Sequence, residues 1–98
     1  MAAYLIANLT ITDPVRFEEY RRQVSKVIAN AGGFYLIRGG EVTVLEGDPG
    51  LQRLVVVEFS DVEAVRSFYD SDEYRPLLAL RQSAATGSVA IVDGFSKG

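Results

Sequence analysis

Hydrophobic and polar positions follow a strand period or a helix period along most of the chain. In residues 4–11, apolar side chains take every second position, which is the alternation of a strand with one buried face. In residues 14–31, apolar side chains recur three and four positions apart, as in an amphipathic helix. Asp13-Pro14 before this segment and Gly32 after it are typical of a helix start and a helix stop.

The next segments predict a hairpin. Residues 34–38 form a short apolar strand, which resumes after Gly39-Gly40 as residues 41–46. Paired glycines inside a strand pattern indicate a bulge or a bend. Residues 47–50 are rich in turn-forming types, and residues 53–59 are almost continuously apolar, as in a central strand.

The remaining residues predict two helical segments and a last strand. Residues 60–63 have the form of a capping box that starts with Ser60. Ser71 can cap a further segment with Pro76 in its first turn, so we expect the helix to break near residues 70–71. Residues 88–95 alternate again. The order strand, helix, strand, strand, helix, strand predicts an α+β fold of the ferredoxin-like type, in a single domain over residues 1–98.

The alternation also assigns the two faces of the predicted sheet. The face that the helices cover carries Leu5, Ala7, Leu9, Val55, Val57 and Phe59. The outer face carries Tyr4, Ile6, Asn8, Leu36, Arg38, Leu54, Val56 and Glu58. Left open to water, the outer face would be a large apolar patch, which marks an interaction surface. We therefore expect a second copy of the chain to cover it in a homodimer.

Composition narrows the range of partners. The chain has 98 residues and a net charge of −3, and its 10 Lys and Arg residues are scattered among 13 carboxylates. Because there is no basic stripe for a phosphate backbone, we expect no nucleic-acid partner. No apolar run reaches the ~20 residues of a membrane span, and the first residues do not resemble a targeting segment. We expect no membrane partner and a cytoplasmic location.

The most informative feature of the composition is that the chain contains neither Cys nor His. This excludes disulfides, thiolate nucleophiles, imidazole bases, His-ligated haem and zinc sites of the usual Cys/His type. The neighbouring carboxylates Glu18-Glu19, and Asp70 with Asp72-Glu73, fit solvated helix surfaces or caps better than a metal site. We expect no metal and no cofactor, so acid–base chemistry has to come from Asp, Glu, Tyr, Lys, Arg or the substrate.

Several spaced motifs are similar to those of one known family. They are residues 35–40, 45–47, 53–59 and 68–71, with Glu73-Tyr74 and Arg81. In this order they closely resemble the domain of unknown function 1330 family over nearly the whole chain. The resemblance implies a dimeric α/β barrel, in which two ferredoxin-like sheets pack face to face around a central cavity. Relatives by fold include cofactor-free monooxygenases, muconolactone isomerases and haem-dependent peroxidases, and fold alone does not choose among these activities.

Arg38 and Glu58 are the first candidate site residues. With the hairpin turn near residues 48–49, both are expected on the outer sheet face, near the ~7–8 Å reach of a cross-strand diagonal. In one interpretation, Arg38 binds an anionic substrate and Glu58 acts as a catalytic base. In the other, the two side chains form a structural ion pair that fixes the hairpin and closes the dimer.

Four further residues are candidates for substrate binding. Tyr69, Tyr74 and Arg81 lie around the predicted helix break, where phenol and guanidinium groups could orient a carboxylate or an enolate oxygen at the mouth of a cavity. Asn8 lies on the outer face of the first strand. Structural roles explain the same residues, as core aromatics, a surface ion-pair partner and a half-exposed strand position.

The sequence therefore leaves two hypotheses for function. In the first, the chain is a small dimeric α/β-barrel protein that binds a small anionic or carbonyl-bearing molecule between its sheet and the partner subunit, with cofactor-free chemistry as an extension. In the second, it is a non-catalytic dimerisation or ligand-sensing module. A carboxylate free of Arg38 in the cavity would favour an enzyme, whereas Glu58 locked in a bidentate pair would favour the module.

Overall fold

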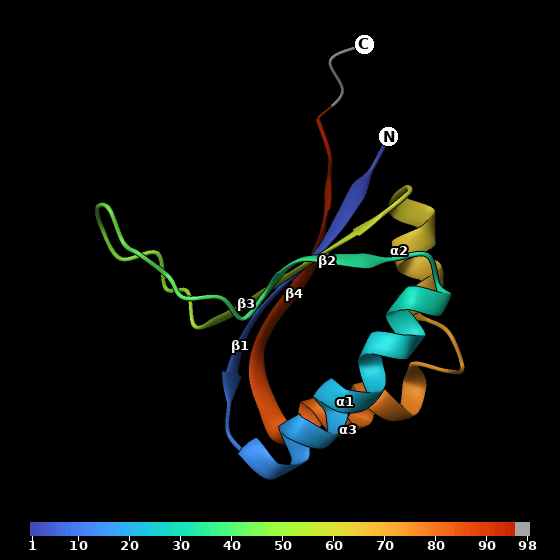
Figure 1. The fold of residues 1–98 in the computed structure, drawn as a ribbon, viewed down its shortest axis with the longest axis horizontal. Coiled ribbons are helices and arrows are strands. Elements are labelled where there is room, and N and C mark those ends of the chain that lie inside the picture. Colours follow the sequence, from blue (N-terminus) through green and yellow to red (C-terminus); the bar gives the residue numbers. More distant parts are fainter. Residues whose placement is uncertain (96–98) are drawn as a thin grey trace.

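The computed structural model describes residues 1–95, in which one antiparallel sheet carries helices on a single face (Figure 1). The strands are β1 (Ala3–Ile11), β2 (Phe34–Arg38), β3 (Arg53–Phe59) and β4 (Ala85–Asp93), and the helices are α1 (Pro14–Asn30), α2 (Val62–Tyr69) and α3 (Arg75–Ala84). The order of strands in the sheet is β2-β3-β1-β4. This order and the antiparallel pairing confirm the predicted ferredoxin-like α+β fold.

Helix α1 begins and ends where the sequence predicts. Asp13 is its N-cap, and a carboxylate oxygen of Asp13 accepts a hydrogen bond from the backbone N–H of Arg16 at 3.1 Å. Pro14 takes the first helical position, where its missing N–H costs nothing. Beyond the other end, Gly32 has a φ of 86°, the left-handed conformation that glycine adopts without strain.

The second helical region breaks at Ser71, as predicted. The Ser71 hydroxyl donates to the carbonyl oxygen of Phe68 at 2.7 Å and accepts from the backbone N–H of Tyr74 at 3.2 Å. It therefore joins the end of α2 to the start of α3. The N-cap of α2 is Asp61 rather than the predicted Ser60, and its carboxylate accepts from a backbone N–H at 2.7 Å. A carboxylate stabilises this position more than a serine hydroxyl does, because the helix dipole favours negative charge at an N-terminus.

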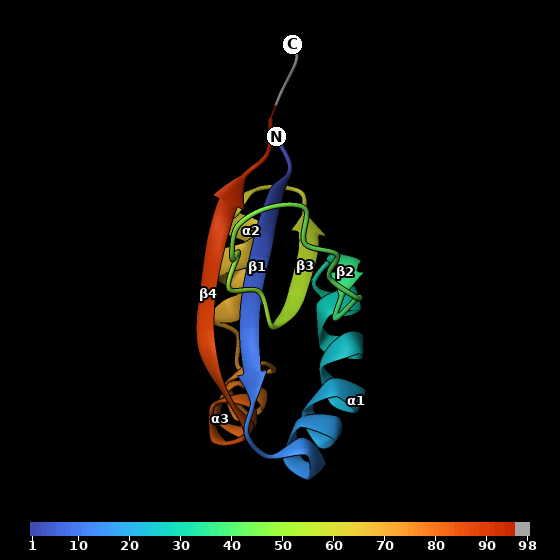
Figure 2. The same ribbon diagram turned by 90° about the vertical axis from the view of Figure 1, so that its left-hand side faces the viewer.

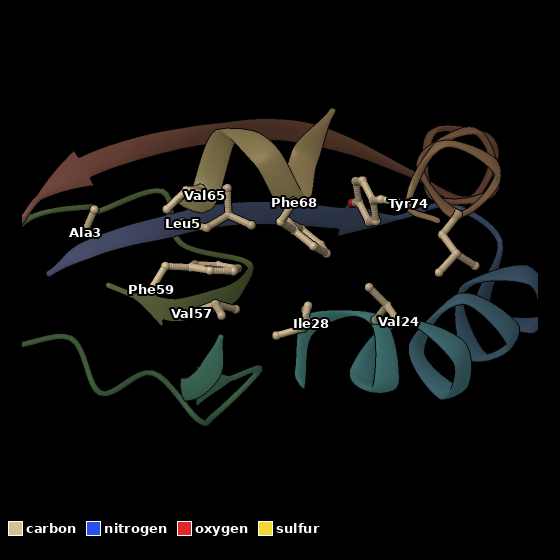
Figure 3. Packing of buried hydrophobic residues seen from close by; sticks show 10 residues of the cluster. Ala3, Leu5, Val24, Ile28, Val57, Phe59, Val65, Phe68 and Tyr74 are labelled. Carbon is tan, nitrogen blue, oxygen red and sulfur yellow. The ribbon is translucent and has the colours of Figure 1, made fainter. Parts of the chain in front are cut away.

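The core lies between the helices and one face of the sheet (Figure 3). Val57 and Phe59 of β3 and Leu5 of β1 point toward the helices and are buried, which confirms the predicted inner face. The rings of Phe59 and Phe68 lie 5.5 Å apart between their centroids. Burial of each such side chain contributes about 1.5–3 kcal/mol to folding.

A loop of residues 39–52 replaces the predicted continuation of the second strand. We expected residues 41–46 to be strand, but within residues 1–95 no strand pairs with them. The loop instead projects away from the helices on the uncovered side of the sheet (Figure 1), and it crosses in front of the strands in Figure 2. A strand needs a neighbour for its backbone groups, and β3 begins only at Arg53. The apolar positions of the loop, such as Val44 and Leu45, are consequently exposed.

Strand β4 begins at Ala85, directly after α3, and not at residue 88 as predicted. Gly87, near the start of β4, allows the strand to lie close to β1. It pairs with Leu9, and a Cβ at Gly87 would collide with the carbonyl oxygen of Asn8. Across residues 1–95, none of the helices combines the length and apolar character that spanning a membrane requires.

Candidate ligand-binding site

A cavity lies between α1 and the helix-covered face of the sheet. Its volume is about 40 Å³, which is room for a few water molecules. Most of its wall is apolar, from Leu5, Ala7, Leu9, Phe17, Val24, Ile28, Val55, Val57, Phe68 and Val89. Its polar groups belong to tyrosine and arginine alone, at Tyr20, Arg21, Tyr35, Arg38, Arg53, Tyr74 and Arg81. An apolar pocket with a few convergent polar groups is the usual form of a small-molecule site.

A bulge in β2 places Arg38 on this cavity. Tyr35 pairs with Val57 and Arg38 pairs with Val55, so a step of three residues in β2 matches a step of two in β3. One extra residue reverses the face of every side chain that follows it. Arg38 therefore shares the inner face with Val55 rather than lying on the outer one.

The side chain of Arg38 then connects β2 to α1. Its Nη2 donates to the carbonyl oxygen of Arg21 at 3.1 Å and to the hydroxyl of Ser25 at 2.7 Å. The guanidinium lies over the ring of Tyr35, 4.5 Å from its centroid, in a cation–π arrangement. Arg38 is exposed and also lines the cavity, so it marks the mouth.

The prediction that Arg38 and Glu58 lie side by side on one face is therefore wrong. Glu58 pairs with Tyr4 and Phe34 on the outer face and does not line the cavity. Within the described residues it forms no ion pair with Arg38, so the structural pair is absent as well. The glycine pair suggested a bulge at residues 39–40, but the bulge lies within residues 35–37, and periodicity cannot locate a single extra residue.

Asn8 also lies on the outer face, where its carboxamide holds the base of the 39–52 loop. Its Nδ2 donates to the carbonyl oxygen of Gly50 at 2.9 Å, and its Oδ1 accepts from the backbone N–H of Gln52 at 2.8 Å. Both ends of the carboxamide are thus bonded to backbone. The structure does not bring Asn8 together with the cavity residues.

Tyr74 and Arg81, by contrast, both line the inner end of the cavity, and Tyr69 lies next to Arg81 without lining the cavity itself. Arg81 is only 8% exposed, and its Nη2 donates to the Tyr69 hydroxyl at 3.4 Å. Tyr74 is 1% exposed, lies beside Phe68 in the core (Figure 3), and shares a hydrogen bond of 2.9 Å with the hydroxyl of Tyr20. The expectation that Arg81 is a surface ion-pair partner is wrong, because the side chain is buried and no carboxylate of the described residues pairs with it.

Both hydrogen-bonded phenols remain protonated at neutral pH. Burial, followed by the neighbouring Tyr74 hydroxyl, raises the pKa of Tyr20 far above its ordinary value. Burial also raises the pKa of Tyr74, although the hydrogen bond from Tyr20 and the positive charge of Arg81 oppose this shift. One hydroxyl of the pair donates to the other, so the inner end of the cavity offers one free O–H group and the Arg81 cation to a ligand oxygen.

Arg53 is a cavity residue that the sequence prediction did not include in the site. Its guanidinium lies over the ring of Phe17, with 5.3 Å between its Cζ and the ring centroid. The buried Nε atom of Arg53 has no hydrogen-bond partner within the described residues. Burial, with the positive charges of Arg21 and Arg38, lowers the pKa of Arg53. Arg53 lies two residues before Val55, and side chains two apart in a strand share one face, so the sequence already indicated an inward side chain.

Arg21 differs from the other cavity arginines because a carboxylate neutralises it. Its Nε and Nη2 atoms donate to the two carboxylate oxygens of Glu18 at 2.8 Å and 2.6 Å. These hydrogen bonds lower the pKa of Glu18 and raise the pKa of Arg21. Arg38, Arg53 and Arg81 have no such partner among residues 1–95.

This arrangement can bind and polarise oxygen atoms, but the described residues that line it include no carboxylate that could act as a base. Phenols and guanidinium groups stabilise negative charge on a carboxylate, carbonyl or enolate oxygen. No Asp or Glu of the described residues lines the cavity, and nowhere in that part of the chain do three acidic residues gather as ligands for a metal ion. The chemistry of the site is therefore recognition of acceptor oxygens inside an apolar wall.

The sequence matches the family described as domain of unknown function (DUF1330) over residues 2–95. A search of curated proteins finds no match. The fold is similar to that of a protein of unknown function from Rhodopseudomonas palustris, at a TM-score of 0.75 and 17% identity, with 97% of this chain and 83% of that chain covered.

Two further solved structures share the fold. The cofactor-independent oxygenase SnoaB from Streptomyces nogalater has a TM-score of 0.67 and 14% identity, with 98% of this chain and 95% of that chain covered. A conserved protein from Methanosarcina mazei Go1 has a TM-score of 0.53 and 16% identity, with 93% of this chain and 88% of that chain covered. At these identities the similarity concerns the fold and leaves the function to the site.

Proposed function

The chain belongs to the domain of unknown function (DUF1330) family, and from the site itself we propose that it binds a small anionic or carbonyl-bearing molecule in the cavity between α1 and the sheet. The observation that carries this proposal is Arg81, a cation that is 8% exposed beside the cavity without a carboxylate partner in the described residues. Burying an uncompensated charge costs several kcal/mol, roughly, and a ligand oxygen would offset that cost. Tyr74 lines the same cavity and is the second group that can reach that oxygen.

The same groups support chemistry without a cofactor as an extension of binding. A guanidinium and a protonated phenol can stabilise an oxyanion as it develops on a carbonyl, which is the largest single contribution in many enzymes. SnoaB, which shares the fold, is described as a cofactor-independent oxygenase. Since no carboxylate of the described residues lines this cavity, a substrate here would have to lose its proton to solvent or within itself.

A non-catalytic ligand-sensing module is the second candidate function. The observation that favours it is the same missing carboxylate among the described cavity residues. Glu58, which the sequence suggested as a base, lies on the other side of the sheet. Binding of the small molecule is common to both candidates, and turnover separates them.

We also propose that a second copy of the chain covers the outer sheet face. This face leaves large apolar side chains in water: Phe34 is 54% exposed, Leu36 51% and Val92 47%. Patches of this kind mark protein interaction surfaces, and two copies of one face can form a symmetric interface. The projecting loop of residues 39–52, with Leu45 94% exposed, would lie against the partner copy.

A thermal-shift screen with small carboxylates, enols and aromatic acids tests the binding proposal. We expect one chemical class to raise the melting temperature, because a ligand at a hundred times its dissociation constant stabilises the fold by ~2.7 kcal/mol. Tyr74→Phe removes one hydroxyl from the cavity and keeps the ring. We expect about a fivefold loss of affinity, the equivalent of ~1 kcal/mol for one hydrogen bond.

Tyr4→Phe is the matched control for that experiment. It makes the same change on the outer sheet face, where the side chain is remote from the cavity wall. We expect it to leave the affinity unchanged. The proposal fails when no compound of the three classes binds, or when both variants bind as tightly as the native protein.

A further inference from the structure

Three guanidinium groups converge at the mouth of the cavity from three different elements. Arg21 comes from α1, Arg38 from β2 and Arg53 from β3, and all three line the cavity. Arg38 is bonded to the backbone carbonyl of Arg21 at 3.1 Å. The positive charges of Arg21 and Arg38 both act on Arg53, since each of them lowers the pKa of Arg53. Like charges are therefore held together where the cavity meets solvent.

One carboxylate of the described residues touches this cluster, and it occupies only one of the three arginines. Glu18 bonds to Arg21 through both of its oxygens, at 2.8 Å and 2.6 Å. Neither Arg38 nor Arg53 forms an ion pair within residues 1–95. Three cations and one anion leave an excess of positive charge at the mouth, which attracts an anion.

Arg53 also has a hydrogen-bond donor that the described part of the chain leaves unused. Its Nε atom is buried and has no partner there, which is rare for a buried polar atom and leaves one donor of the guanidinium free for a ligand. The position of the guanidinium is fixed by its surroundings. Phe17 lies under it at 5.3 Å, and Gly39, whose φ is 69°, leaves the space that a Cβ would take from it.

We propose that Arg53 and Arg38 form an anion subsite at the cavity mouth, and that the ligand is a carboxylic acid with an apolar body and a second oxygen that reaches Arg81 and Tyr74. This inference rests on the proposed function and names the ligand class of the same cavity. The guanidinium fork matches the two oxygens of a carboxylate, as the Glu18–Arg21 pair already demonstrates in this protein. The apolar wall inside the mouth favours an anion with an apolar body. Because the cavity of about 40 Å³ is smaller than such a molecule, side chains of the wall have to move apart when it binds.

The two ends of the cavity therefore recognise different parts of one molecule. Arg38 is exposed and Arg53 half-buried, which suits a charged group that remains close to water. Arg81 and Tyr74 are buried, which suits a neutral or weakly basic oxygen such as a carbonyl or a phenol. A ligand without a charge would engage only the inner end.

Calorimetric titration of the native protein with a matched pair of compounds tests this inference. 4-Hydroxybenzoate carries a carboxylate and a phenol on a flat ring, and 4-hydroxybenzamide has the same shape without the charge. At fixed ionic strength we expect the acid to bind at least about tenfold more tightly, since a charge-assisted pair exceeds a neutral hydrogen bond in strength. Inorganic phosphate serves as an anion without an apolar body and is expected to bind far more weakly than the acid.

Arg53→Gln and Arg38→Gln identify the residues responsible. Each should remove most of the preference for the acid and leave the affinity for the amide close to that of the native protein. Arg75→Gln is the matched control, because Arg75 is exposed and pairs with Asp72 away from the cavity. Circular dichroism verifies that each variant is folded, and either of the two cavity variants suffices when the other does not fold.

The outcomes separate this inference from the function on which it rests. When acid and amide bind the native protein equally well, the anion subsite is wrong and the proposed binding function stands. When phosphate binds as tightly as the acid and loses affinity in Arg53→Gln, the mouth binds oxyanions without regard to an apolar body. The proposal that the ligand is a carboxylic acid is then wrong. When neither the acid nor the amide binds, both the ligand class and the cavity function are overturned for this kind of molecule.

Discussion

The hydrogen bond between Tyr20 and Tyr74 is the point at which the core and the cavity meet. The two hydroxyl groups lie 2.9 Å apart, one from α1 and the other at the start of α3. Each ring packs among other aromatic rings, with Tyr74 4.5 Å from Phe68 between centroids. The pair therefore gives stability and presents a polar group to the cavity at the same time.

The raised pKa values of these two tyrosines predict a loss of stability in alkali. In the unfolded chain both phenols titrate near 10.0, whereas folding holds them protonated to higher pH. Below pH 10 both states carry the proton, so the contribution is complete. Above it the unfolded state releases protons first, and the free energy of unfolding falls as pH rises.

Urea denaturation between about pH 8 and about pH 11 measures this effect. We expect the double variant Tyr20→Phe/Tyr74→Phe to lose stability less steeply than the native protein above pH 10, because neither ring can ionise. Parallel curves for the two proteins in that range would show that the phenols do not carry the alkaline transition.

Single elements show which parts of the fold the sequence could predict. Helix starts and stops depend on local chemistry, so Asp13, Gly32 and Ser71 were recognisable from residue type and spacing. The bulge in β2 depends on how two strands pair, and one extra residue there decides the face on which Arg38 lies. Tyr69 and Tyr74 flank the helix break as the sequence predicts, whereas Arg38 lies on the opposite sheet face from the predicted one.

Ser71 offers a test of how much one cap contributes between two short helices. Ser71→Ala removes a bond to the carbonyl oxygen of Phe68 and another from the N–H of Tyr74. We expect a loss of about 1 kcal/mol, which lowers the melting temperature of a domain this size by roughly 4–8 °C. Ser83→Ala is the control, since that exposed hydroxyl only bonds back to the carbonyl oxygen of Leu80. Equal melting temperatures for the two variants would mean that capping by Ser71 does not contribute measurably to stability.

At the scale of the whole molecule, the two sheet faces have different surroundings. The inner face packs against three helices (Figures 1 and 2). It holds the cavity, while the outer face and the 39–52 loop expose apolar side chains. Alternation in β1 and β3 predicted this division because each strand has a strict period of two. The sequence could not predict the loop, because an alternating segment becomes a strand only where a neighbouring strand pairs with it. Residues 41–46 have no such neighbour in the described chain.

Ile37→Lys tests whether the outer face is a subunit interface. Ile37 is 40% exposed and pairs with Val56 within that face. We expect the native protein to sediment at twice the 10.7 kDa chain mass and the variant at the chain mass, because a lysine there would bury a charge in the interface. Val15→Lys is the control, since Val15 is 81% exposed on α1. A native protein that sediments at the chain mass at micromolar concentrations contradicts the dimer.

The distribution of tyrosines gives the protein a built-in optical signal. The chain has five Tyr and no Trp, so its intrinsic ultraviolet emission comes from tyrosine. Tyr20, Tyr35 and Tyr74 line the cavity and Tyr69 contacts Arg81 at its inner end, which leaves Tyr4 on the outer face. The emission therefore reports mainly on the cavity, and occupancy can be followed by fluorescence without attaching a dye.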